Sequence, residues 1–204
     1  RCCTTRKISK PIIGFSKLAN LDLSNALTAL RTQGVIAYPT ESVFGLGCDP
    51  DCDNAIQKIL DLKKRPAHKG LILIAANIEQ LKSYADFSTL TEIQIGNIQK
   101  TWPGPFTWVV PANKKLSKLI SGDFDSVAVR VSAHPVVQQL CSQFGKPIIS
   151  TSANLSGLEA CIDAKTVKKM FKGNELLDVV IEEQVAGLKT PSQIHHALTG
   201  KRLR

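Results

Sequence analysis

The chain reads Pro147-Ile148-Ile149-Ser150-Thr151-Ser152-Ala153-Asn154-Leu155-Ser156-Gly157 at the point where an apolar run gives way to small polar residues. The apolar residues predict a short buried strand, and hydroxyls, an amide and a glycine follow it at once. In open α/β sheets, ligands bind at the carboxyl ends of strands. We therefore expect a ligand site at this junction.

Apolar, β-prone runs alternate with helical patterns on both sides of this junction. The periodicity predicts helices over residues 23–33, 53–62, 89–101, 135–144 and 164–171, with a helical turn at 78–81. It predicts strands over residues 35–38, 71–75, 106–110, 127–131, 148–150 and 179–181. The tight corner WPGP at 102–105 is too short for a parallel crossover. We expect an α/β fold: a single-domain, open, twisted, mixed sheet flanked by helices.

Composition is typical of a soluble protein with one domain. Of the 204 residues, 43% are hydrophobic and 21% charged. The longest apolar run, residues 71–76, is far shorter than the ~20 residues of a membrane helix, and the N-terminal residues lack the apolar core of a signal peptide. The six cysteines include no CxxC pair, so we expect reduced thiols. These features predict a cytoplasmic protein without a membrane contact.

The positive charge is concentrated at the two ends of the chain. Residues 1–10 contribute +4 and residues 201–204 contribute +3 to the formal net charge of +9, which leaves +2 for everything between. A nearly neutral body does not by itself indicate a nucleic-acid surface.

The loop after the first predicted strand carries a second group of small polar residues. Pro39 ends the strand, so Thr40 and Ser42 are expected at the rim of the sheet. Gly45 and Gly47 would permit the close approach of a bound group. The competing interpretation is a corner whose hydroxyls only satisfy backbone groups. The loop matches neither GxxxxGK[ST] nor GxGxxG.

Three cations, Lys63, Lys64 and Arg65, follow a predicted helix that Asp53 can cap. Cations at a helix C-terminus offset the helix dipole by about 0.3–1 kcal/mol, which explains them without any function. Alternatively, Lys63 and Arg65 point together at a phosphate from an unwinding turn. Together with the polar junction, the second interpretation favours an enzyme that handles phosphate.

Arg130 lies in a predicted strand of otherwise small or apolar residues. A buried charge is costly unless it is paired or reaches a ligand, so Arg130 is a candidate site residue. His134 precedes a helix-starting proline and is equally well explained as a capping residue. The chain has no Ser/His/Asp set and no HExxH, and its motif carboxylates, Glu41 and Asp49, do not suggest a glycosidase pair.

Five motifs occur in order: PTESVFGLGCDP (39–50), LKKRPAHKGLIL (62–73), WPGPFTWVV (102–110), VAVRVSAHP (127–135) and STSANLSG (150–157). Their order and spacing closely resemble the YrdC family, the single-domain threonylcarbamoyl-AMP synthases of bacteria. The resemblance runs from about residue 18 to residue 204. It implies a YrdC-like catalytic domain over residues 13–204, with a positively lined cavity. We expect residues 1–12 to be a basic segment that is flexible or foreign to the natural chain.

The resemblance implies a nucleotidyltransferase that converts L-threonine, bicarbonate (or CO2) and ATP into L-threonylcarbamoyl-AMP and pyrophosphate. A tRNA-modifying transferase complex would then use this product on an adenosine next to the anticodon. Weak direct binding of RNA or tRNA is a further possible partner interaction. We expect Mg²⁺ bound through the ATP phosphates, and no metal site made by the protein, because the motifs hold few carboxylates.

The resemblance also assigns site residues, position by position. The family's tetrad, which holds the ATP phosphates, is matched by Lys63, Arg65, Ser152 and Asn154. Further residues on the nucleotide side are Arg130 and Arg204. Residues on the threonine side are Thr40, His134 and Ser192.

The expected chemistry is a displacement at the α-phosphate of ATP by a carbamate of threonine, with pyrophosphate leaving in line. Such a step needs positioning and positive charge more than a general base. This agrees with motifs that are rich in Lys, Arg, Ser and Asn.

Two other functions are compatible with the sequence. An RNA-binding protein of ribosome or tRNA maturation would use a basic cavity and basic termini without nucleotide turnover, but the chain has no RNP motif or KH loop and only 5% aromatic residues. A carbamoyl-transfer enzyme of the same fold would use a different acceptor.

Overall fold

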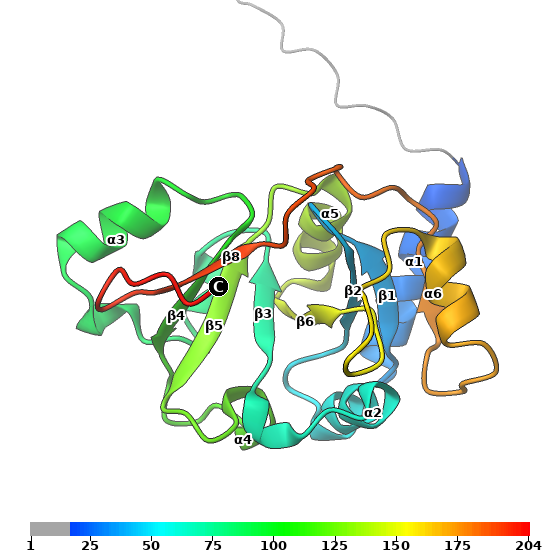
Figure 1. Cartoon of the computed structure of the whole chain (residues 1–204), viewed down its shortest axis with the longest axis horizontal. Helices are drawn as coiled ribbons and strands as arrows, with labels where there is room; N and C mark the ends of the chain where they lie inside the picture. The colour runs from blue at the N-terminus through cyan, green and yellow to red at the C-terminus, as the bar shows by residue number, and fades with distance from the viewer. Residues whose placement is uncertain (1–16) are drawn as a thin grey trace, which may run out of the picture.

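One mixed sheet of eight strands forms the centre of the protein. The computed structural model describes residues 17–204, and the strand order is β7-β1-β2-β6-β3-β5-β4-β8 (Figure 1). The strands are β1 (Ile36–Pro39), β2 (Phe44–Gly47), β3 (Ile72–Ala75), β4 (Phe106–Pro111), β5 (Ser126–Val131), β6 (Ile148–Ser152), β7 (Val179–Val180) and β8 (Gln193–His196). The pairs β1–β7, β3–β5 and β4–β8 are parallel and the others antiparallel. The expected α/β fold with a mixed sheet is confirmed.

Helices pack on both faces of this sheet. They are α1 (Lys17–Arg31), α2 (Asp53–Lys63), α3 (Glu92–Gln99), α4 (Lys118–Ser121), α5 (Pro135–Phe144) and α6 (Ala164–Met170). Adjacent residues of β3 divide between two cores: Leu73 packs in a cluster with residues of α2 and α3, and Ile74 in a cluster with residues of α1 and α5. Ile72 lies on the same face of β3 as Ile74 but is only half-buried. The second face is therefore partly open, and this opening holds the candidate site.

Two strands and one α-helix escaped the sequence prediction: β2, β8 and the short α4. Strand β2 reads FGLG, and glycine is depleted in strands. Its glycines are needed for packing, because a Cβ on Gly47 would lie 2.6 Å from the carbonyl oxygen of Ile149 and 2.7 Å from the ring of Tyr38. The expectation that Gly47 admits a ligand is therefore wrong. Gly45 also lies against Tyr38 but does line the cavity described below.

The helix beginnings also differ from expectation. Asp53 does not cap α2: the N-cap is Cys52, without a side-chain bond, and the Asp53 carboxylate accepts a hydrogen bond from Ser117 Oγ at 2.7 Å. The helix expected over residues 89–101 is shorter, because Thr91 caps it and forms a capping box with Gln94.

The remaining predictions concern the surface and the termini. None of the helices between residues 17 and 204 is long and apolar enough to cross a membrane. Within the same range, Cys48, Cys52, Cys141 and Cys161 are free thiols, as expected. The predictions for residues 1–12, including Cys2 and Cys3, fall outside the described residues.

Candidate functional site

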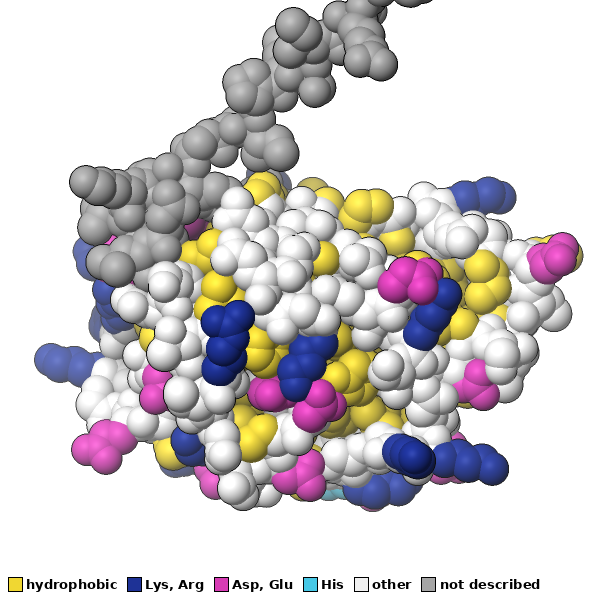
Figure 2. Space-filling model, turned by 180° about the vertical axis from the view of Figure 1, so that it is seen from behind, with side chains coloured by type: hydrophobic (Ala, Val, Ile, Leu, Met, Phe, Trp, Pro, Cys, Tyr) yellow, Lys and Arg dark blue, Asp and Glu magenta, His cyan; other side chains and the backbone are white. Residues whose placement is uncertain are grey.

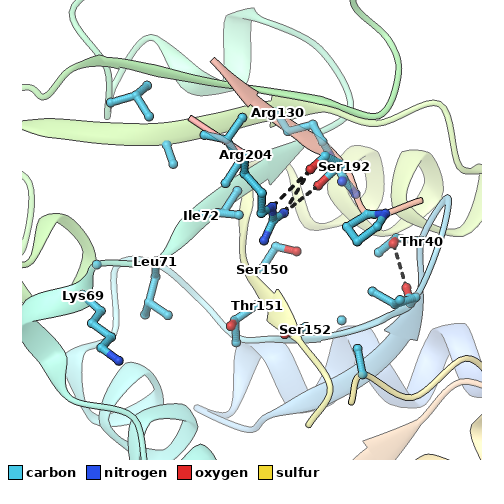
Figure 3. A pocket seen from close by; sticks show the side chains of 18 of the residues that line it. Thr40, Lys69, Leu71, Ile72, Arg130, Ser150, Thr151, Ser152, Ser192 and Arg204 are labelled. Atoms are coloured by element: carbon cyan, nitrogen blue, oxygen red, sulfur yellow. Dashed lines mark hydrogen bonds between the residues drawn. The ribbon is translucent and has the colours of Figure 1, made fainter. Parts of the chain in front are cut away.

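A cavity of about 650 Å³ lies over the open part of the sheet, and β2, β3, β4, β5, β6 and β8 contribute to its lining (Figure 3). In β5 and β8, strand alternation selects the lining residues. In β5, Ala128 and Arg130 line the cavity, whereas Val129 between them is buried in the core. In β8, Ile194 and His196 line it in the same alternating way. The sheet itself therefore positions these side chains.

The floor of the cavity has an apolar strip. Val109, Ala128 and Ile72 are register partners on the adjacent strands β4, β5 and β3, and Ser150 of β6 continues the row. All four line the cavity. A flat apolar group would fit this strip, with hydrogen-bonding groups at the β6 end.

The charge of the lining is of one sign. Its cationic side chains are Arg65, Lys69, Arg130 and Arg204, and no Asp or Glu belongs to the described lining. Lys69 and the two arginines 130 and 204 approach the cavity from different elements (Figure 3). Such a cavity is suited to an anionic ligand that also has an apolar part.

Lys63 lies beneath the junction after β6. It is the last residue of α2 and is only 2% exposed. Its Nζ donates to the backbone oxygen of Ser152, and to the backbone oxygen and Oδ1 of Asn154 at 2.8 and 3.0 Å. Burial, together with the positive charge of Arg65, lowers the pKa of Lys63 to about 8. The interpretation of Lys63 as a surface charge that only offsets the helix dipole is therefore wrong.

The other predicted phosphate-holding residues line the cavity around this junction. Ser152 Oγ donates to Asn154 Oδ1 at 2.6 Å, and Asn154 Nδ2 donates to the carbonyl oxygen of Leu158 at 2.7 Å. Arg65 Nη2 donates to the carbonyl oxygen of Gly70 at 3.0 Å, and its buried Nε has no hydrogen-bond partner. The structure thus brings Arg65, Ser152 and Asn154 to one cavity, with Lys63 directly behind them.

Arg130 is 6% exposed, and its charge is paired: Nη2 lies 2.8 Å from Oε2 of Glu41, which is 4% exposed. Its buried Nε has no partner. Arg130 also lines the cavity, so its buried charge is paired and at the same time placed to reach a ligand.

Ser192 and Arg204 form a second polar group at the cavity (Figure 3). Arg204 Nη2 donates to the carbonyl oxygen of Ser192 at 3.1 Å and to its Oγ at 3.2 Å. The backbone of Arg204 bonds to that of Ile194, which fixes the residue beside β8. Burial, with the nearby charge of Arg130, lowers the pKa of Arg204. Ser192, which was assigned to the threonine side, and Arg204, which was assigned to the nucleotide side, are therefore in direct contact.

Thr40 lines the cavity and is 4% exposed. Its Oγ1 donates to the carbonyl oxygen of Val43 at 2.7 Å. For this hydroxyl, the interpretation as a corner residue that satisfies a backbone group is therefore correct. The oxygen can still accept a bond from a ligand. The backbone oxygen of Thr40 accepts from the N–H of Ala186 at 3.2 Å, and that of Glu41 from Leu188 at 3.0 Å, so the loop between β7 and β8 is docked here.

His134 does not belong to the cavity lining. It is the N-cap of α5: its Nδ1 accepts from the N–H of Val136 at 3.3 Å, and its Nε2 lies 3.0 Å from the carbonyl oxygen of Gln184. These contacts require a proton on Nε2 and none on Nδ1. Burial lowers the pKa of His134, which favours this neutral form. The capping interpretation is confirmed, and the threonine-binding role stays a prediction.

Sequence reasoning left several cavity residues out. Ser150 shares a face with Ser152, because residues two apart in a strand point the same way, and this signal was present in the sequence. His196 had no signal, because β8 was not predicted. Among residues 17–204, no cluster of three or more His, Cys, Asp or Glu side chains could hold a metal ion.

Comparison with known proteins gives a consistent result. The family model Sua5/YciO/YrdC, described as "Telomere recombination", matches residues 28–204. The threonylcarbamoyl-AMP synthase of Psychromonas ingrahamii is 69% identical over 187 residues, which cover 92% of this chain and 98% of the relative. The enzyme of the same name from Yersinia enterocolitica is 56% identical over 182 residues, covering 89% of this chain and 94% of the relative.

A solved structure extends the likeness to three dimensions. The crystal structure of P. abyssi Sua5 complexed with L-threonine is 31% identical to this chain, with a TM-score of 0.77. The match covers 85% of this chain but 50% of that one, so this chain corresponds to half of the solved protein.

Proposed function

The chain belongs to the Sua5/YciO/YrdC family, and we propose that it is a threonylcarbamoyl-AMP synthase, which forms L-threonylcarbamoyl-AMP and pyrophosphate from L-threonine, bicarbonate and ATP. Relatives that carry this enzyme name are 52–69% identical over nearly their whole length. The expectations of family, enzyme class and role in tRNA modification are thereby confirmed, and the RNA-binding alternative is not favoured.

The observation that carries the proposal is the cationic cradle at the junction after β6. Lys63 orders the backbone at Ser152 and Asn154, and Arg65 reaches the same cavity. No carboxylate in the described lining would repel a triphosphate. We assign the ATP phosphates to this cradle, because charge-assisted donors around a phosphate give both affinity and geometry.

We assign the amino-acid substrate to the region of Thr40 and Ser192, and we keep Arg130 on the nucleotide side, where the resemblance places it. The solved relative with bound L-threonine supports threonine as the substrate. Thr40 and Ser192 offer hydroxyls, which suit the ammonium and the hydroxyl of threonine. His134 enters this assignment only through the loop that it holds at Gln184.

In the proposed reaction, the amine of threonine and bicarbonate form a carbamate and release water. A carbamate oxygen then attacks the α-phosphorus of ATP, the bond between the α-phosphorus and the α,β-bridging oxygen breaks, and pyrophosphate leaves with the electron pair. The chain's own residues bind and orient the groups and stabilise the charge of the leaving pyrophosphate. Arg65, which lines the cavity and whose Nε has no hydrogen-bond partner, is suited to that stabilisation.

Mg²⁺ is a proposed cofactor that arrives with the nucleotide. The described chain offers no carboxylate cluster for a divalent ion, and hydroxyls such as Ser42 could add only neutral ligands. This donor set fits a cation held chiefly by phosphate oxygens. When bound, the ion would neutralise part of the phosphate charge.

We further propose a cytoplasmic location and delivery of the product to a tRNA-modifying transferase complex, with at most weak direct binding of tRNA. The face opposite to the view of Figure 1 supports a minor role for RNA, because basic and acidic side chains are interspersed on it (Figure 2). A nucleic-acid surface would instead gather basic residues on one face.

Pyrophosphate release from ATP tests the proposed function, with L-threonine and bicarbonate each omitted in turn from CO2-depleted buffer. We expect release that requires both, and that stops on addition of EDTA. Serine in place of threonine tests the acceptor, and we expect slower release. Release that needs neither substrate, or RNA binding with steep salt dependence and no turnover, would favour the alternative function.

A further inference from the structure

Glu41 pairs with a cation of the cavity without itself belonging to the lining. Its carboxylate is 2.8 Å from Arg130 Nη2, and both side chains are less than a tenth exposed. Within residues 17–204, none of the other lining cations, Arg65, Lys69 and Arg204, has a carboxylate partner. Arg130 is thus distinguished from the other cations of the site.

The segment after β5 fixes the orientation of this carboxylate. Oε1 of Glu41 accepts from Ser132 Oγ at 2.8 Å and from the N–H of Ala133 at 3.0 Å. With Oε1 held by these two donors, Oε2 is left facing Arg130. The donors lie two and three residues after Arg130 in the chain, so one short segment holds both the arginine and its carboxylate partner.

Arg130 keeps unused hydrogen-bonding capacity. A guanidinium has five N–H groups, and one bond to Glu41 uses only Nη2. Nε is buried and has no partner. The charge of Arg130 also lies close enough to Arg204 to lower the pKa of that residue. Two cations near each other, at a lining without carboxylates, leave room for an anionic group between or beside them.

We propose that Glu41 is a positioning residue, which holds the guanidinium of Arg130 at the cavity so that its free N–H groups meet an anionic group of a substrate. Without Glu41, Arg130 would be a buried charge beside a second arginine, and it would turn toward another partner. This inference rests on the proposed function for the identity of the substrates, but the geometry concerns Arg130 alone.

A double-mutant cycle with Glu41→Gln, Arg130→Met and the double variant tests the proposal. For each variant, kcat and the KM of ATP and of threonine are measured from pyrophosphate release. We expect Arg130→Met to raise the KM of one substrate at least tenfold, and Glu41→Gln to raise the KM of that same substrate with a smaller change in kcat. In the double variant, Glu41→Gln should add less than a twofold effect.

The cycle separates positioning from a general structural role. If Glu41 only stabilised the fold, its effect would multiply with that of Arg130→Met, or it would fall on kcat and both substrates alike. Either result would overturn the proposal, as would an unchanged KM in Glu41→Gln. The loop after β7 is docked through the backbone bond from Leu188 to the carbonyl oxygen of Glu41, which none of these side-chain substitutions removes.

Two further variants keep the test decisive. Glu41→Asp retains the charge but ends one methylene short of Arg130, so it should fold and raise the same KM by a smaller factor; an effect on the other substrate would contradict the proposal. Asp49→Asn is the matched control, because Asp49 pairs with Lys146 at 2.6 Å and neither residue lines the cavity. It should leave both KM values within twofold.

Calorimetric binding of ATP and of threonine to the same variants separates this inference from the proposed function. If the wild-type protein binds a substrate but shows no threonine-dependent turnover, the proposed function is contradicted. The affinities of the variants for that substrate then still test the positioning role of Glu41. Loss of affinity in both Arg130→Met and Glu41→Gln for the same ligand supports positioning, and loss in only one of them contradicts it.

Discussion

The ammonium of Lys63 lies 3.0 Å from Oδ1 of Asn154, a residue 91 positions further along the chain. Three oxygens in all accept from this ammonium, and all belong to Ser152 and Asn154. The end of α2 therefore holds the junction after β6 in the shape that presents its polar groups to the cavity. The charge of one buried lysine thus controls the geometry of the cradle assigned to phosphate.

Activity should depend on the protonation of Lys63. Burial and the charge of Arg65 lower its pKa to about 8, so the residue is a cation below that pH and neutral above it. A neutral amine attracts no phosphate, so kcat/KM for ATP should fall above pH 8, approaching tenfold per pH unit. In Lys63→Arg the charge persists, and the alkaline fall should disappear although the plateau is lower. An identical alkaline limb in both proteins would contradict this role.

The same pKa shift affects stability with a defined sign. Between about pH 8 and the ordinary lysine pKa of 10.5, Lys63 is protonated in the unfolded chain and neutral in the folded one. The unfolded state therefore binds more protons, and the free energy of unfolding should rise with pH in this window. The contribution is about 3 kcal/mol at 1.36 kcal/mol per pKa unit. Urea unfolding of the wild type and Lys63→Met, compared at pH 7 and pH 10.5, measures it.

Arg65→Ala should cut turnover more than tenfold, because it removes the planar donor of the cradle. The change should also lower the free energy of unfolding by about 1–2 kcal/mol. Arg65 is half-buried, and its Nη2 donates to the carbonyl oxygen of Gly70. Arg65→Lys is the control, which keeps the charge but not the fork; turnover unchanged in Arg65→Ala would exclude a role in phosphate binding.

Asn154→Ala should weaken ATP binding at least tenfold and threonine binding much less. The change removes an acceptor of Lys63 and the donor that holds the carbonyl oxygen of Leu158. Titration calorimetry with each ligand measures both affinities. Ser156→Ala is a useful comparison, since its Oγ bonds to the backbone of Lys63 at 2.9 Å without lining the cavity. Equal losses for both ligands in Asn154→Ala would contradict the assignment.

The fold was largely predictable where the local hydrophobic pattern of a segment matches its burial in the folded protein. The strand at 127–131 is an apolar run, and β5 (Ser126–Val131) occupies it. β8 reads QIHH, which has no apolar periodicity, so it was missed. That strand is stabilised as an edge by its pairing with β4, a contact between segments that are distant in sequence.

The site was predictable as a set of residues but not as a geometry. The sequence indicated that Arg130 needs a partner, yet nothing local identified Glu41, which lies 89 positions away. It assigned Lys63 to the phosphate site but did not indicate its burial, because a lysine that ends a helix is usually solvated. Only the folding of the segment after β6 over the end of α2 makes it buried. Long-range contacts of this kind have no periodic signal in the sequence.

Two glycine substitutions should have opposite effects on stability. In Gly47→Ala, the new Cβ would lie 2.6 Å from the carbonyl oxygen of Ile149 and 2.7 Å from the ring of Tyr38, both inside the sheet. Backbone and a fully buried ring cannot yield without opening β2, so we expect a loss of about 2–4 kcal/mol. In Gly96→Ala, nothing lies within 4 Å of the new Cβ on α3. The better helix propensity of alanine should raise stability by about 0.5–1 kcal/mol. Thermal unfolding of both variants measures these changes in stability. A Gly47→Ala protein as stable as the wild type would show that β2 tolerates a side chain at this position and that packing does not require Gly47.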